Sequence, residues 1–240
     1  MDPANAHGEA QEPFNALLHG GAVRASEQPI RFAGSVLGAH RHICAFFHSP
    51  DQEYRVLLPF IKEGFERGEK AFHIVDPTLR EEHLRRLESA SIDVAAAEQR
   101  GQFELRNWAD AYLRDGHFDQ GKMLALVQEV LEGARQQGFP LTRLVPHMEW
   151  ALEDRPGVDD LVEYETRVNY IWPRYKDPVI CVYDLAKFGG DIVVDIMRTH
   201  PMIIIGGILQ ENPFFMPPDQ FLRELHARGN RRNRSHPSSP

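Results

Sequence analysis

Hydrophobic residues along the chain follow two alternating patterns. Residues 43–47 form a short, uninterrupted apolar run, which is typical of a buried strand. Tyr54, Leu57 and Ile61 then recur at helical spacing, and Gly68 ends the helix predicted over residues 54–66. The alternation continues, with further strands predicted at 70–75, 103–108, 141–150, 179–183 and 202–209, and further helices from residue 78 onward and at 123–137, 158–172 and 192–197.

This order of elements predicts the fold class. Strands that alternate with helices of about ten to fifteen residues are joined by right-handed crossovers and form a mainly parallel sheet. Apolar strands of this kind need helices on both faces of the sheet. We therefore predict a single three-layer α/β domain over residues 39–222, since neither an internal repeat nor a second composition block occurs there.

The two flanks differ from this domain in composition. Residues 1–38 are rich in Ala, Gly, Pro and Gln without sustained periodicity, which predicts a flexible N-terminal arm. Residues 223–240 are predicted to form a basic flexible tail, with arginines at 228, 231, 232 and 234 and no acidic residue from 226 onward. A solvated chain end is the simpler interpretation of this tail, and contact with nucleic acid or an acidic partner is the alternative.

Composition and charge narrow the functional class. The 240 residues are 42% hydrophobic and 26% charged, as in ordinary globular proteins. The net charge of −8 argues against direct nucleic-acid binding by the domain. The longest apolar stretch, residues 202–209, is far shorter than the roughly 20 residues of a membrane helix, so no membrane span is predicted. Cys44 and Cys181 lie in apolar segments and no signal peptide is visible, so we predict a cytoplasmic protein.

The sequence lacks the motifs of several kinds of active site. The first strand-to-helix turn, residues 47–52, reads FHSPDQ, without the glycines and lysine of a phosphate-binding loop, and Asp51 would repel phosphate. No G-x-S-x-G elbow occurs, and cysteines within strands behave as small buried hydrophobes. The sequence therefore predicts neither a cofactor nor a catalytic residue.

Twelve histidines raise the question of a metal site. His42 and His48 would lie about 20 Å apart on one strand, too far to chelate one ion. Neither HExxH nor CxxC occurs. A site assembled across strands, for example from His48, His73 and His147, is the alternative left open. The simpler interpretation is a hydrogen-bonded or exposed role for each histidine, so no metal is predicted.

The most informative residues lie at the ends of the predicted strands. In an open parallel sheet, the carboxyl ends of the strands converge on a crevice that commonly binds ligands. Aromatic side chains would form its walls, and a histidine and carboxylates would orient a small, weakly polar organic molecule. The predicted ligand-binding residues are Phe47, His48, Ser49, Asp76, Trp108, Glu149, Trp150, Tyr183 and Asp184. Each of them singly is also explained by core packing or helix capping.

Several sequence strings together resemble a known family. They are HICAFF at 42–47, YLRDGHFD at 112–119, MEWAL at 148–152, Tyr164-Glu165 with Asn169, CVYDL at 181–185, THP at 199–201 and NPFF at 212–215. In order and spacing they look like the MEDS domain, a sensory module of methanogen and methylotroph regulators. The similarity extends over residues 40–222, nearly the whole predicted domain.

This resemblance implies a RecA-like or KaiC-like α/β fold without the ATP-binding loop, and a role in prokaryotic signal transduction with simple hydrocarbon derivatives as ligands. Family members usually carry an output module, and the flanks here are too short for one. We therefore expect a non-enzymatic sensor that signals to a separate partner, such as a kinase or a sigma or anti-sigma regulator. The alternatives are a degenerate RecA-like ATPase, a hydrolase with Glu149 as general base, and a scaffold that binds only protein. Homo-oligomerisation stays open.

Overall fold

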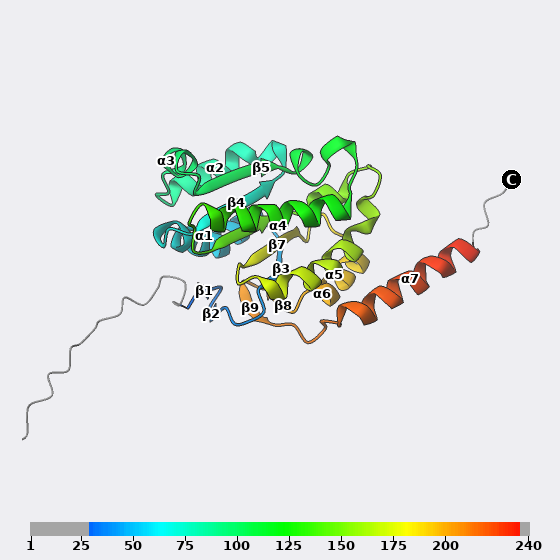
Figure 1. Cartoon of the computed structure of the whole chain (residues 1–240). Coiled ribbons are helices and arrows are strands. Elements are labelled where there is room, and N and C mark those ends of the chain that lie inside the picture. Colours follow the sequence, from blue (N-terminus) through cyan, green and yellow to red (C-terminus); the bar gives the residue numbers. More distant parts are fainter. Residues whose placement is uncertain (1–28, 236–240) are drawn as a thin grey trace, which may run out of the picture.

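A seven-stranded sheet forms the centre of the computed structural model, which describes residues 29–235 (Figure 1). The strand order is β5-β4-β6-β7-β3-β8-β9, and every pairing is parallel except that of β8 with β9. The strands are β3 (His42–Phe47), β4 (Lys70–Val75), β5 (Phe103–Asn107), β6 (Thr142–Pro146), β7 (Val179–Asp184), β8 (Met202–Ile205) and β9 (Ile208–Glu211). The predicted α/β class with a mainly parallel sheet is confirmed.

Helices cover both faces of this sheet (Figure 1). α1 (Pro50–Glu66), α2 (Arg80–Ser89) and α3 (Val94–Gln99) pack on one face, and α4 (Gln120–Gln136), α5 (Leu161–Ile171) and α6 (Gly190–Thr199) pack on the other. α7 (Pro218–Ser235) follows, and short 3₁₀ helices are η2 (Pro77–Leu79), η3 (Trp108–Asp110), η4 (Arg114–Gly116), η5 (Glu149–Leu152), η6 (Val158–Asp160) and η7 (Trp172–Arg174). In the part of the chain described, none of the helices is long and apolar enough to cross a membrane.

The central strand β3 shows how the sequence builds three layers. All six of its residues are buried. Successive side chains on a strand point to opposite faces. Cys44 and Phe46 accordingly pack toward α4, α5 and α6, whereas Ile43, Ala45 and Phe47 pack toward α1. Because both faces of β3 are apolar, the strand lies in the interior of the sheet, between β7 and β8.

Two of the predicted strands differ from the observed ones. β6 ends at Pro146, and residues 149–152 form a 3₁₀ helix instead of continuing the strand. The strand predicted at 202–209 is a hairpin of β8 and β9, in which Gly206 and Gly207 have φ angles of 61° and 79°. Glycine adopts positive φ without steric cost, so the pair reverses the chain and makes β9 an antiparallel edge strand.

The prediction of a flexible arm over residues 1–38 is wrong for the last ten of these residues. β1 (Arg31–Phe32) and β2 (Ser35–Val36) form a small antiparallel hairpin. Three side chains of this segment are buried, those of Ile30, Phe32 and Leu37. The ring centroid of Phe32 lies 4.4 Å from that of Phe60 in α1, so the hairpin belongs to the domain. Residues 1–28 lie outside the described part of the chain.

The prediction of a flexible tail over residues 223–240 is also wrong, because α7 continues through most of it. Phe221 of α7 is fully buried, and Arg228 pairs with Asp195 of α6 at 2.8 Å. The predicted domain boundary at residue 222 therefore falls inside a packed helix. Residues 236–240 lie outside the described part of the chain.

Candidate functional site

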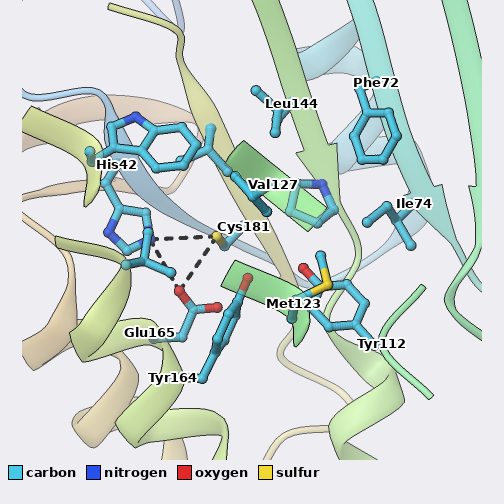
Figure 2. A pocket seen from close by; sticks show the side chains of 14 residues that line it. His42, Phe72, Ile74, Tyr112, Met123, Val127, Leu144, Tyr164, Glu165 and Cys181 are labelled. Carbon is cyan, nitrogen blue, oxygen red and sulfur yellow. Dashed lines mark hydrogen bonds and ion pairs between the residues drawn. The ribbon is translucent and has the colours of Figure 1, made fainter. Parts of the chain in front are cut away.

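Four side chains that can exchange protons or bind a metal meet on the α4–α6 side of the sheet. His42 begins β3, Cys181 lies within β7, Glu165 extends from α5, and His200 directly follows α6. Their exposed fractions are 1%, 3%, 0% and 0%. Figure 2 shows three of them, His42, Glu165 and Cys181, in contact with one another at one end of a cavity. We call these four residues the buried cluster.

The contacts in the buried cluster converge on one carboxylate oxygen. Oε2 of Glu165 lies 3.1 Å from Nε2 of His42 and 3.4 Å from Nε2 of His200. Sγ of Cys181 lies 3.7 Å from the same oxygen and 3.7 Å from Nε2 of His42. The other carboxylate oxygen, Oε1, accepts a hydrogen bond of 3.1 Å from the hydroxyl of Tyr183. This bond holds the carboxylate with Oε2 toward the histidines.

Neighbouring groups fix which nitrogen of each histidine faces the cluster. The side-chain amide nitrogen of Asn169 donates to the carbonyl of Thr199 at 2.7 Å, so Oδ1 of Asn169 is the acceptor 3.1 Å from Nδ1 of His42. Nδ1 of His200 lies 3.0 Å from the carbonyl of Ile196. Both Nδ1 atoms therefore carry a proton and donate it, and both Nε2 atoms point into the cluster.

Burial and mutual contact shift the ionisation of these groups. Burial alone would raise the pKa of Glu165, but its close contacts with the imidazoles of His200 and His42 lower that pKa to about 2. Burial would lower the pKa of His200, but the two cysteines and the carboxylate around it raise that pKa well above its usual value. Burial raises the pKa of Cys181 to about 12, so the thiol stays protonated at neutral pH. Without a metal, the cluster is thus a carboxylate paired with an imidazolium.

A cavity of about 20 Å³ adjoins the cluster (Figure 2), which is room for one or two water molecules. His42, Glu165 and Cys181 form its polar end. The rest of its wall is mostly apolar and comprises Phe72, Ile74, Tyr112, Met123, Val127, Leu144, Pro146, Tyr164, Val168, Trp172 and Val179. Every lining residue is buried. The residues predicted as ligand-binding are absent from this lining in the described chain.

The parallel sheet does bring the predicted residues to one edge, because each follows or ends a strand. The aromatic ones, however, face the interior. Phe47, Trp150 and Tyr183 are exposed by 2% or less, and Trp108 by 9%. The ring of Trp150 stacks on that of Tyr112, with centroids 4.5 Å apart. A role of these rings as ligand walls stays a prediction.

Two of the predicted polar residues cap helices. Ser49 Oγ accepts a hydrogen bond from the backbone amide of Gln52, at 3.3 Å, at the start of α1. Asp76 Oδ1 accepts from the backbone amide of Thr78 at 2.8 Å and caps η2. His48, between β3 and α1, is exposed. These contacts explain the sequence pattern of the turn without a ligand.

The remaining two predicted residues lie around one lysine. Nζ of Lys187 is 4.0 Å from Glu149 and 3.8 Å from Asp184. Burial raises the pKa of Glu149, although His147 and Lys187 act against it. This group is the polar part of the predicted strand-end crevice, and its binding of a ligand stays a prediction.

The alternative metal site of His48, His73 and His147 is wrong. Nδ1 of His73 is hydrogen-bonded to Nε2 of His83 at 2.9 Å, and Nε2 of His147 to Glu53 at 2.7 Å. One ring nitrogen of each of these buried imidazoles is therefore engaged elsewhere, and within the described residues neither belongs to a group that could hold an ion. Across residues 29–235, the buried cluster is the one group of three or more such side chains that could hold an ion.

A second group of buried histidines makes stability depend on pH. Burial, with His73, His147 and Arg80 nearby, lowers the pKa of His83 well below 6.5. In the unfolded chain His83 binds a proton below pH 6.5, whereas the folded protein keeps it neutral, so acidification favours unfolding. We expect His83 alone to reduce the free energy of unfolding by about 2 kcal/mol between pH 7 and pH 5.

The variant His83→Gln tests this expectation. It loses the contacts of His83 with Tyr54 and His73, so it should be less stable than the wild type at pH 7. On acidification to pH 5, however, it should lose about 2 kcal/mol less. Urea unfolding at both pH values measures this, and His48→Gln at an exposed position should behave as the wild type. The expectation fails if the wild type and His83→Gln lose the same stability.

The buried cluster was not predicted from the sequence, although all four of its residues occur in segments that the sequence analysis had singled out. His42, Glu165, Cys181 and His200 all lie in the strings that carry the family resemblance. Asn169, which orients His42, lies there as well. The polar residues shared by those strings, rather than the strand ends, are the signal that could have indicated this site.

The strand order, the two helix layers and the capped first turn place this protein in the class of RecA-like α/β domains that lack a phosphate-binding loop. The solved structure of a KaiC-like protein, PH0186 from Pyrococcus horikoshii OT3, is similar with a TM-score of 0.51 and 14% identity, over 68% of this chain and 70% of that one. Within this class the chain belongs to the MEDS family, the methanogen/methylotroph, DcmR sensory domain, whose sequence model matches residues 41–201.

One protein similar to this chain is a transcriptional repressor. The transcriptional repressor DcmR of Methylorubrum extorquens (strain DSM 6343 / CIP 106787 / DM4) is 27% identical over 169 residues, which are 70% of this chain and 61% of the repressor. The chain thus spans about three fifths of the length of that relative. The family description assigns this chain a sensory role.

Proposed function

We propose that this chain is a non-enzymatic sensory domain that binds a small organic molecule in the cavity that adjoins the buried cluster and reports its presence to a separate regulatory partner. The observation that supports this most is the cavity itself, apolar along most of its wall and polar at one end. Ligand sites combine apolar walls with a few polar groups that fix orientation. The cavity has room for one or two non-hydrogen atoms, so a simple hydrocarbon derivative larger than methanol would require the wall to move.

The wall of the cavity can adapt to a ligand slightly larger than the cavity itself. Met123 of α4 contributes an unbranched side chain, and such side chains adapt to irregular spaces. Movement of α4 would also change the surface of the domain, since Leu124 and Leu126 on the same helix are only partly buried. A ligand that favours one position of α4 would shift the population of the state that the partner binds.

The chemistry of the buried cluster supports binding rather than covalent catalysis. A thiol, an imidazole and a carboxylate are the groups of a nucleophilic triad. Here, however, burial raises the pKa of Cys181 to about 12, and the thiolate is the form that attacks. A protonated thiol in this cavity can contact a ligand but does not act as a nucleophile.

A substitution that adds one methylene group to the cavity wall tests the proposal. Val127→Leu adds a methylene at the wall, so it should leave the melting temperature unchanged or raise it while weakening ligand binding about tenfold or more. Isothermal titration of the wild type and the variant with methanol, dichloromethane and ATP with magnesium measures affinity. The matched control is Val130→Leu, one turn along α4 and outside the cavity wall.

Two outcomes contradict the proposal. One is the absence of saturable binding of any of the small organic molecules to the wild type. The other is binding that Val127→Leu leaves unchanged while Glu149→Gln abolishes it, which would place the ligand at the strand ends. Specific binding of ATP would instead favour a nucleotide-dependent enzyme.

A further inference from the structure

We propose that the buried cluster of His42, Glu165, Cys181 and His200 is a zinc site. The four side chains come from β3, α5, β7 and the end of α6, and each offers one ligand atom. The four ligand atoms all lie within 4.8 Å of one another. The site shares His42, Glu165 and Cys181 with the polar end of the cavity, but zinc binding is tested without any organic ligand.

Four of the six distances between ligand atoms in the cluster are close to those of a tetrahedral site. Zinc binds nitrogen and oxygen at about 2.0–2.1 Å and sulfur at about 2.3 Å, so nitrogen and oxygen ligands lie about 3.3 Å apart, and sulfur lies about 3.6 Å from either. In the cluster the nitrogen-to-oxygen distances are 3.1 and 3.4 Å. The sulfur of Cys181 lies 3.7 Å from both Nε2 of His42 and Oε2 of Glu165 (Figure 2).

The directions of the lone pairs call for a cation at the centre. Nδ1 of both His42 and His200 donates to an oxygen, so in its neutral form each ring presents the Nε2 lone pair to the carboxylate of Glu165. Lone pairs that face a carboxylate repel it unless a proton or a metal ion lies between them. Nε2 of His200 is buried and has no hydrogen bond of acceptable geometry. Without a metal, the proton of the His200 imidazolium supplies the positive charge there; a metal ion that replaces this proton would bind Nε2 of His200.

Charge balance favours a divalent ion in such a buried place. A zinc ion bound to one thiolate, one carboxylate and two neutral imidazoles forms a group with no net charge. Burial of a charged group is costly unless the charge is compensated, and here the ligands compensate it completely. Metal binding would also deprotonate the thiol of Cys181, since a coordinating thiol binds as the thiolate.

Groups around the cluster support the ligands as they do in known zinc sites. Metal-binding histidines usually donate the other ring N–H to a carbonyl or carboxylate oxygen, and ligating carboxylates are hydrogen-bonded in turn. Asn169 and the carbonyl of Ile196 serve His42 and His200 in this way, and Tyr183 serves Glu165. Nitrogen and sulfur ligands favour zinc over magnesium or calcium, which prefer oxygen.

The first test uses the unaltered protein. The full chain, without an affinity tag, is produced in zinc-supplemented medium and analysed by inductively coupled plasma mass spectrometry, which should find about one zinc per chain. Production with Co²⁺ instead should give the strong visible absorption of tetrahedral cobalt and a thiolate charge-transfer band in the near ultraviolet. A chelator in partly denaturing urea should remove the metal and lower the melting temperature.

Single substitutions then test whether Cys181 binds the zinc ion. Cys181→Ser should abolish the charge-transfer band and reduce bound zinc at least tenfold. The matched control is Cys44→Ser, its neighbour in register on β3. The thiol of Cys44 lies near His200 and the carbonyl of Met202 but is not one of the four candidate ligands. This control should keep both the band and the zinc. If Cys181→Ser fails to fold, the cobalt spectrum of the wild type still decides the question.

A wild-type protein that contains no metal and binds none during production overturns the proposal. So does a cobalt complex without the thiolate band, or a Cys181→Ser variant that keeps it. These outcomes are read without any organic molecule present. They are therefore separate from the outcomes that test ligand binding in the cavity.

Discussion

Replacement of Arg143 by alanine is expected to destabilise the protein by about 3–5 kcal/mol. Arg143 lies in β6 with 1% of its surface exposed, and its Nε donates to Glu69 at 2.5 Å. It also pairs with Glu63 at 3.0 Å and donates to the carbonyl of Phe60. Glu69 is equally buried, so loss of the guanidinium leaves a buried carboxylate with less compensation. Urea unfolding measures the change.

A double substitution separates charge from packing at this position. Arg143→Met with Glu69→Gln removes both charges and keeps most of the volume, so it should be at least about 1 kcal/mol more stable than Arg143→Ala. Gly64→Ala should also destabilise, because an added Cβ would lie 2.8 Å from the Cδ and Nε atoms of Arg143. An Arg143→Ala variant within about 1 kcal/mol of the wild type would show that the ion pairs contribute little.

Replacement of Trp150 by alanine is expected to cost about 3–5 kcal/mol of folding stability, because a fully buried indole leaves a cavity. The ring contacts those of Tyr112 and Phe118, with centroid distances of 4.5 and 4.3 Å. Trp150→Phe keeps part of these contacts and should cost less. Denaturant unfolding of both variants, with circular dichroism to check secondary structure, measures the difference.

The same variants decide between two roles of this residue. If Trp150 is a wall of a ligand site at the strand ends, Trp150→Ala should weaken ligand binding and change stability little. If Trp150 is a core residue, Trp150→Ala should mainly lower the folding stability. A loss below about 1 kcal/mol would contradict the core interpretation drawn from its burial.

The layered fold could be predicted because its determinants are local. A strand such as β3 or β7 is an uninterrupted apolar run, and α4 places Met123, Val127 and Leu131 on one side. The β8–β9 hairpin was missed because two glycines between apolar segments do not interrupt the pattern. The β1–β2 hairpin was missed because its stability comes from contact with α1, which no periodicity within residues 29–38 reveals.

The site could be predicted less well, for a related reason. Strand ends can be located from sequence, so the common edge of the sheet was expected. Which side chains face one another across that sheet depends on register and on helix rotation. His42 and Glu165 touch although they are 123 positions apart, and neither lies at the carboxyl end of a strand. No local pattern indicates that pairing.

The position of β3 has a consequence for the order in which the protein folds during synthesis. β4 pairs with both β5 and β6, and these three strands are complete once residue 146 has been made. β3 precedes all of them in the chain, yet its two neighbours are β7 and β8, which start only at Val179 and Met202. Until then its HICAFF segment has unpaired edges on a growing chain, and such edges promote association between chains. Slow translation of the last third therefore lengthens the period of risk, and protection by a chaperone is most useful before residue 205 is complete.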